Sequence, residues 1–195
     1  HFGENLVDTL NSGDASKLEV VPAITPFSAA HVMERWATMR AYFQALDFLT
    51  EAGVPAYQVR AVWQHFGGDA EKVLSLDPWQ LVQVGLTFQQ ADEVADRLAL
   101  DKKNPKRVQG ALLHVARTGR GMGHLFLTAK EVLSQASLLM EGVEIPDMVR
   151  GLKELHDAGS LVLDRQTSPG TTAVYEPGWH HLDGACASLL KGRQV

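Results

Sequence analysis

The residues that could carry out chemistry are few, and none of them is arranged as a catalytic site. The glycine-rich stretch RTGRGMGH (117–124) lacks the preceding strand and the terminal Gly-Lys-Ser/Thr of a phosphate-binding loop, so we predict a flexible turn there and no nucleotide hydrolysis. His180 and His181, with Asp183 and Cys186 nearby, make a poor metal site, because adjacent side chains diverge and no second ligand cluster supports them. The sequence therefore predicts no catalytic residue, no metal and no cofactor in this chain.

Three short turns could instead hold an anion. In each, a small residue and an aliphatic residue precede the start of a helix: Ala23-Ile24-Thr25, Gly53-Val54-Pro55 and Gly85-Leu86-Thr87. The small residue allows the backbone to approach closely, and the aliphatic residue fills the space between two helices. The first N–H groups of the second helix lack intrahelical partners and can bind a phosphate. This pattern is typical of the helix-hairpin-helix unit of DNA-binding proteins, and it predicts DNA contacts from Gly53, Gly85, Leu86, Thr87 and Gln89.

An internal repeat supports a tandem arrangement of these units. The segment HFGENLVDTL at His1 returns as HFGGDAEKVL at His65, and the stretches 22–36 and 84–98 align with each other. Ala29 and Ala91 occupy equivalent places, where a small side chain lets two helices cross closely.

The same turns also permit a purely structural interpretation. Such hairpins usually carry glycine where this chain has Thr25 and Thr87, and the extra Cβ narrows the approach to a phosphate, although the hydroxyl could donate a hydrogen bond. Pro55 removes one N–H donor outright. The turns would then be helical hairpins kept for packing.

Charge is unevenly distributed along the chain. The net charge is −5, which argues against a broadly basic nucleic-acid binder. The segment 97–130 nevertheless has eight basic residues and one acid, a charge of +7 that leaves −12 for the remainder. We expect Lys102, Lys103, Lys106 and Arg107 to contact the phosphate backbone; the alternative is an ordinary solvated helix start.

The second half predicts a different kind of module. Helices are expected at 105–118, at 129–139 behind a capping box of Thr128 and Glu131, and at 145–158. Short strands are expected at 125–127, 161–164 and 172–177, the last two joined by a turn at 168–170. This order is that of a winged helix. The acids Asp147, Glu154 and Asp157 make its third helix a poor reader of bases, so a structural or partner-contacting role is favoured.

Together these elements predict a mainly α chain with tandem helix-hairpin-helix units at 1–100, the first truncated at its N-terminus, and a winged-helix-like α+β module at 101–195. With 195 residues, 45% of them hydrophobic, the chain can bury a core. It begins inside an expected helix, so we expect a fragment of a longer protein. No apolar run has the length of a membrane span, and the single Cys186 fits a reducing cytoplasm.

Nearly the whole chain resembles, in order, the RecD-like (RecD/TraA-type) bacterial DNA helicases. The resemblance is carried by the stretch from HFGENL to PAIT, by 48–98, and by GHLFLTAKEVL, LKELHDAGSLVLD and VYEPGW. It implies a region that precedes two RecA-like motor domains, which move 5′ to 3′ on single-stranded DNA and use ATP and magnesium.

From the resemblance we expect the partners to be DNA, single-stranded or at a junction and without sequence preference, and the motor domains of the same polypeptide. The region itself would be non-catalytic and would hold or guide DNA. The alternative is a protein-docking or autoregulatory scaffold without direct DNA contact, which the acidic net charge favours.

Overall fold

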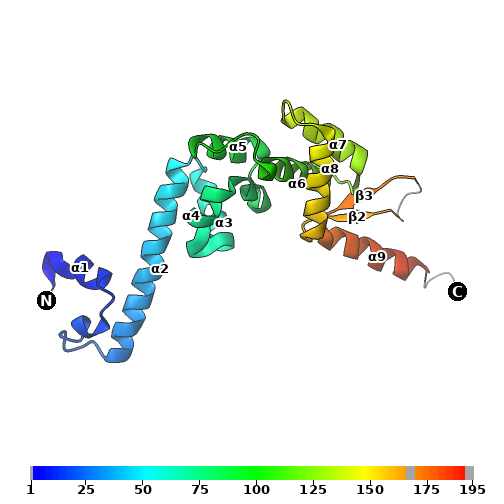
Figure 1. Ribbon diagram of the computed structural model, residues 1–195. Coiled ribbons are helices and arrows are strands. Elements are labelled where there is room, and N and C mark those ends of the chain that lie inside the picture. Colours follow the sequence, from blue (N-terminus) through cyan, green and yellow to red (C-terminus); the bar gives the residue numbers. More distant parts are fainter. Residues whose placement is uncertain (1, 166–169, 192–195) are drawn as a thin grey trace. The chain divides into compact units, whose positions relative to one another are not determined.

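The computed structural model describes residues 2–165 and 170–191, and the chain forms two compact units, His1–Val73 and Leu74–Val195. The described residues are mainly helical, with a small three-stranded sheet in the second unit (Figure 1). Among the described residues, we find no helix with the length and apolar character needed to cross a membrane.

The first unit is built around one long helix. Helix α2 starts where Thr25 and Ser28 form a reciprocal capping box and Pro26 takes the first helical position. It ends before Gly53, whose φ of +87° lies in the left-handed region that glycine adopts without strain. The elements of this part are η1 (Gly3–Asn5), α1 (Leu6–Asn11), η2 (Ala15–Leu18), α2 (Pro26–Glu51), α3 (Ala56–Phe66) and η3 (Gly67–Asp69).

The repeated sequence adopts a repeated local structure. Gly3 and Gly67, which follow the two copies of His-Phe, have φ values of +50° and +57° and each begins a 3-10 turn that runs into a helix. Further along each copy, Leu18 and Leu81 are buried at equivalent places. The repeat is therefore a feature of the fold as well as of the sequence.

The second unit is organised by α6, which packs against η4, α5, α7 and α8. Glycines let its neighbours come close: a Cβ on Gly110 would lie 2.5 Å from the Cβ of Trp79, and one on Gly119 would lie 2.6 Å from a methyl carbon of Leu127. The elements of this part, of which α4 begins at the end of the first unit, are α4 (Ala70–Leu76), η4 (Pro78–Val84), α5 (Phe88–Arg97), α6 (Pro105–Gly121), β1 (Leu127–Thr128), α7 (Ala129–Leu139), α8 (Ile145–Asp157), β2 (Val162–Asp164), β3 (Ala173–Tyr175) and α9 (Pro177–Lys191).

The three strands form an antiparallel sheet in the order β1-β3-β2. Leu127 pairs with Val174, and Val162 pairs with Tyr175. The β2–β3 hairpin lies beside α8 (Figure 1). Strands β2 and β3 lie within the expected strands 161–164 and 172–177, whereas β1 shares only Leu127 with the expected strand 125–127 and Pro177 already belongs to α9. The helix start at Thr128, with its capping box to Glu131, is present. Most of the expected turn at 168–170 lies outside the described residues.

One prediction about this half is wrong. The glycine-rich stretch 117–124 is not a loop from its start, because α6 continues to Gly121 rather than ending at Thr118. Gly119 is buried in that helix and its missing side chain makes room for Leu127. Gly119 therefore allows close packing inside a helix, although the composition of the stretch 117–124 is typical of a loop.

The boundary between the two compact units does not coincide with the boundary predicted from the sequence motifs. The predicted division at residue 100 separates α5 from α6, whereas these two helices pack together in one unit whose boundary lies at Val73. The physical reason is a set of contacts across residue 100, including the pair between Asp92 and Arg107 described below. The division at 100 remains a proposal about sequence motifs rather than about packing.

Candidate nucleic-acid interface

The turn at Gly85 has the geometry that close backbone approach requires. Gly85 is exposed, has a φ of +97°, and would have no atom within 4 Å of an added Cβ. Its N–H donates to the carbonyl of Val82 (3.2 Å), and the Leu86 N–H donates to the carbonyl of Leu81 (3.2 Å). Leu86 is buried, as a residue that fills the space between two helices must be. This turn therefore presents bare backbone to solvent while its aliphatic residue anchors it.

Thr87 starts α5 and uses its side chain within the chain. Its hydroxyl accepts from the N–H of Gln90 (3.2 Å) and lies 3.2 Å from Oε1 of Gln90, which also accepts from the Thr87 N–H (2.9 Å). The hydroxyl is therefore engaged in a capping box and is not the phosphate donor that the sequence suggested. Of the four N–H groups that a helix start leaves without intrahelical partners, those of Phe88 and Gln89 have no partner in the part of the chain that the structure describes, and Gln89 is exposed.

The turn at Gly53, in the first unit, repeats this geometry. Gly53 donates to Thr50 (3.0 Å) and Val54 to Leu49 (2.8 Å), the same spacing of donors and acceptors as at Gly85, and Val54 is buried. Pro55 starts α3 without a side-chain cap. The backbone of this turn is thus equivalent to that of the turn at Gly85, but it has one N–H donor fewer because Pro55 has no backbone N–H.

The turn at Ala23 is different. Ala23 has no positive φ, and Ile24 donates three residues back to Val21 (2.9 Å). The helix-starting Thr25 has the same capping box as Thr87, but the element before the turn is the short η2. The resemblance between these two stretches of sequence therefore extends to the helix start and not to the turn.

Three of the four predicted cationic contacts lie at the surface, between α5 and the first turn of α6. Lys102 forms an ion pair with Asp96 (3.1 Å) and keeps 63% of its side chain exposed. The Lys106 ammonium donates to Oε1 of Gln109 (3.1 Å). Lys103 is exposed, and within the described part of the chain its ammonium has no partner. These lysines can reach a phosphate without breaking buried contacts.

Arg107 is the exception, because it is buried. Its Nε and Nη2 donate to the two carboxylate oxygens of Asp92, both at 2.8 Å, and its guanidinium lies 5.5 Å from the ring centre of Phe88. The Trp79 indole N–H donates to the same carboxylate (3.0 Å). We therefore assign Arg107 to the packing of η4, α5 and α6, and not to direct contact with DNA.

The electrostatics of this pair agree with its geometry. Burial by itself raises the pKa of Asp92, but the hydrogen bonds from Arg107 and Trp79, with the charge of Arg107, hold that pKa below its ordinary value. The hydrogen bonds that Arg107 donates to Asp92 raise the pKa of Arg107. Both groups are charged at neutral pH, so the pair is an ion pair with bidentate hydrogen bonding.

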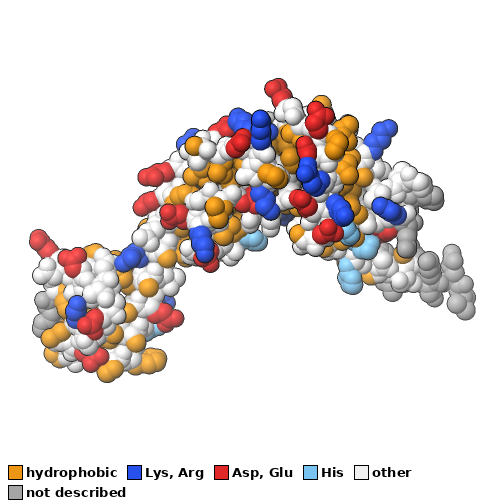
Figure 2. Space-filling view, in the orientation of Figure 1, with side chains coloured by type: hydrophobic (Ala, Val, Ile, Leu, Met, Phe, Trp, Pro, Cys, Tyr) orange, Lys and Arg blue, Asp and Glu red, His pale blue; other side chains and the backbone are white. Residues whose placement is uncertain are grey.

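Other cations of the basic segment are also neutralised by acids from elsewhere in the chain. Arg117 and Arg120 both bind Glu176, at 2.9 and 2.6 Å, and Arg117 also donates to the carbonyl of Val82 (3.0 Å). On the face shown in Figure 2, basic and acidic side chains are interspersed rather than gathered into one basic stripe. The local charge available to DNA is therefore smaller than the count over 97–130 indicates.

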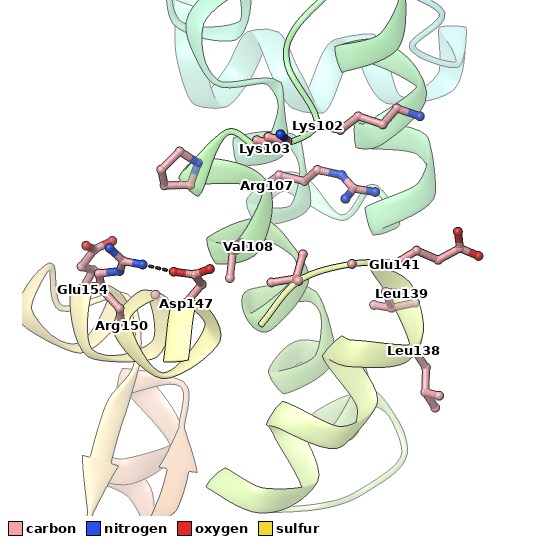
Figure 3. Close-up of a pocket in the computed structure, with 14 residues that line it drawn as sticks. Lys102, Lys103, Arg107, Val108, Leu138, Leu139, Glu141, Asp147, Arg150 and Glu154 are labelled. Carbon is pink, nitrogen blue, oxygen red and sulfur yellow. Dashed lines mark hydrogen bonds and ion pairs between the residues drawn. The ribbon is translucent and has the colours of Figure 1, made fainter. Parts of the chain in front are cut away.

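A groove of about 960 Å³ lies beside the first turn of α6. Lys102 and Lys103 line it from one side, Leu138 and Glu141 from α7 and the residues after it, and Asp147 and Arg150 from α8 (Figure 3). Arg150 forms an ion pair with Asp147 across one turn of α8. The lining is thus of mixed charge and partly apolar.

Comparison with known families identifies the central part of the chain. Residues 38–126 match the family described as the ATP-dependent RecD2 DNA helicase HHH domain. This segment belongs to the RecD2 helix-hairpin-helix family. The match includes the turns at Gly53 and Gly85 and the lysines at the start of α6, whereas the turn at Ala23 precedes it and α7, α8 and the sheet follow it. The matched domain is of the DNA-binding type and is described as part of an ATP-dependent helicase.

Reasoning from the sequence missed the acidic partners of the arginines. Asp92 and Glu176 lie 15 and 56 residues from Arg107 and Arg120, respectively. One signal was present: Asp92 follows the buried Ala91 and precedes the buried Val94 and Ala95 in an amphipathic helix. A carboxylate that is itself largely buried beside an apolar face is stabilised by a cationic partner, and a nearby arginine can supply it.

Proposed function

We propose that this region holds DNA without sequence preference beside the motor of a RecD2-type helicase. The observation that carries the proposal is the bare, positive-φ turn at Gly85, followed by the N–H groups of Phe88 and Gln89, which have no partner in the described ranges 2–165 and 170–191. Three surface lysines lie in the same unit. Backbone N–H groups and lysines bind phosphates and read no bases, so the grip would be electrostatic.

The equivalent turn at Gly53 supports a tandem arrangement of helix-hairpin-helix units, with Gly53 as a second phosphate contact. The motor domains, with ATP and magnesium, would lie elsewhere in the same polypeptide. Single-stranded or junction DNA is the proposed ligand, in a bacterial cytoplasm.

We further propose that residues 101–195 include a winged-helix-like module that contacts protein. The helix and strand order, with a β1-β3-β2 sheet, is the one such a module has. Its third helix, α8, exposes Ile145 (64%) and Val149 (49%) together with acids, a surface that suits a protein partner better than a phosphate backbone. A protein-docking role for this module is compatible with DNA binding by the RecD2 domain.

The test is DNA binding by the chain over a range of salt concentrations. Fluorescence anisotropy with labelled single-stranded and junction oligonucleotides of unrelated sequence gives the affinity and the salt slope. Replacing Lys102, Lys103 and Lys106 by Glu should weaken binding equally for all sequences and lower the log–log slope by roughly 2 to 3, at about 0.7 to 0.9 per phosphate contact.

The matched control changes the same net charge elsewhere. Lys17, Lys72 and Lys153 are also exposed, and replacing them by Glu should leave the slope nearly unchanged. If both triple variants lose the same DNA affinity and the same salt slope, DNA binding depends only on net charge and not on the positions of the three lysines. A parent chain that does not bind DNA at low salt would refute the proposal and favour the scaffold alternative.

A further inference from the structure

Arg107 joins the starts of two helices. It is the third residue of α6, and it binds Asp92 of α5 with two hydrogen bonds of 2.8 Å while its guanidinium packs over Phe88, the first residue of α5. Phe88 directly follows Thr87, and Arg107 directly follows Lys106. One side chain therefore connects the turn at Gly85 with the lysine-bearing start of α6.

The connection is rigid for physical reasons. A planar guanidinium bound to both oxygens of a carboxylate has its orientation fixed as well as its distance. The side chains of Arg107 and Asp92 are only 10% and 18% exposed, so water competes poorly for them. Trp79, itself buried, donates to the same Asp92 carboxylate (3.0 Å) and prevents that carboxylate from turning.

We propose that Arg107, through Asp92, is a positioning residue for DNA: it sets the spacing between the backbone N–H groups of α5 and the lysines at and just before the start of α6, so that both contact the same phosphate backbone at once. This inference rests on the proposed DNA-binding function. It assigns no contact between Arg107 and DNA. Two groups held at a fixed spacing bind one ligand more tightly than the same groups on segments that move independently.

If Arg107 positions these groups, the contribution of a nearby lysine to DNA affinity should depend on whether Arg107 is present. Lys103 is the best reporter, because it is exposed and its ammonium has no partner among the described residues. In the parent chain, Lys103→Gln should lower affinity roughly five- to eightfold at 0.1 M salt, the value for one phosphate contact with a slope of about 0.7 to 0.9. In an Arg107→Met background the same change should lower affinity less than twofold.

The experiment is a double-mutant cycle on DNA binding, with Lys103→Gln, Arg107→Met and the double variant beside the parent chain. Circular dichroism and thermal melts establish that each protein is folded at the assay temperature. Arg120→Met is the control, since Arg120 also forms an internal ion pair, with Glu176, but lies at the far end of α6. In that background Lys103→Gln should keep its full effect.

Arg107→Lys is the second variant, for the case in which Arg107→Met does not fold. It retains the positive charge but cannot bind both carboxylate oxygens with a planar fork, so the Lys103→Gln effect should again shrink. A Lys103→Gln effect of the same size in all backgrounds would overturn the positioning role while leaving DNA binding intact. A parent chain that does not bind DNA at all would instead remove the proposed function on which it rests.

Discussion

Substituting Gly110 by alanine tests how tightly the core beneath the candidate interface is packed. An added Cβ would lie 2.5 Å from the Cβ of Trp79 and 3.1 Å from its Cγ, far inside normal contact. Trp79 is 2% exposed and its indole N–H is bound to Asp92, so it cannot move aside without giving up that hydrogen bond. Either α6 shifts or Trp79 shifts, and both disturb the packing that positions Arg107.

The magnitude follows from three opposing effects. Alanine is favoured over glycine inside a helix by about 1 kcal/mol. Overpacking of a core costs about 1 to 3 kcal/mol, and loss of a hydrogen bond to a charged acceptor costs about 1.5 to 3 kcal/mol. The free energy of unfolding should therefore fall by about 1.5 to 5 kcal/mol. At about 4 °C per kcal/mol for a unit of this size, Tm should fall by roughly 6 to 20 °C.

Gly121→Ala is the matched control, because Gly121 ends the same helix and an added Cβ there would meet no atom within 4 Å. Its Tm should stay within about 2 °C of the parent or rise slightly. Thermal melts followed by circular dichroism compare the two variants. If Gly110→Ala and Gly121→Ala melt at the same temperature, the close contact between α6 and Trp79 does not limit stability and this reasoning is refuted.

Three further predictions concern the turn, a half-buried carboxyl and catalysis. Gly85→Val should lower the free energy of unfolding by about 1 to 3 kcal/mol, because a β-branched residue is strained at a φ of +97° even though the surrounding space is open. Thr87→Gly should preserve or improve DNA affinity in binding titrations. It should lower the free energy of unfolding by only a few tenths of a kcal/mol. Burial raises the pKa of Asp77, so its ionisation opposes folding as pH rises through that pKa; Asp77→Asn should raise Tm at pH 7, and melts below about pH 4 should show no such gain. The purified chain should show no DNA-stimulated ATPase activity above a buffer blank, since it has no phosphate-binding loop; measured turnover would contradict this.

The sequence predicts the local structure of this chain well, because local structure depends on neighbouring residues. The capping box of Thr128 with Glu131 and the repeated His-Phe-Gly turns are visible in short stretches of sequence, and both are present. The turn at Gly85 is predictable for the same reason, since it needs only a glycine, an aliphatic residue and a helix start.

The contacts of the candidate interface were less predictable, because they join residues that are distant in sequence. Counting charge over 97–130 treats Arg107 and Arg120 as surface cations, whereas their acidic partners lie outside that segment, in Asp92 and Glu176. The role of Gly119 was missed for a similar reason. Only the position of Leu127 in the folded chain shows that a helix, and not a loop, needs a glycine there.

Helix α6 has two ends with different neighbours. Its first turn carries Lys106 and Arg107, and near its other end Arg117 and Arg120 bind Glu176, which lies between β3 and α9. Between them, its buried middle contacts η4 and α8. Local fraying therefore cannot expose this middle, and its amide hydrogens should exchange with solvent only in molecules whose second unit has opened as a whole. A ligand bound at either end would slow that exchange throughout the helix.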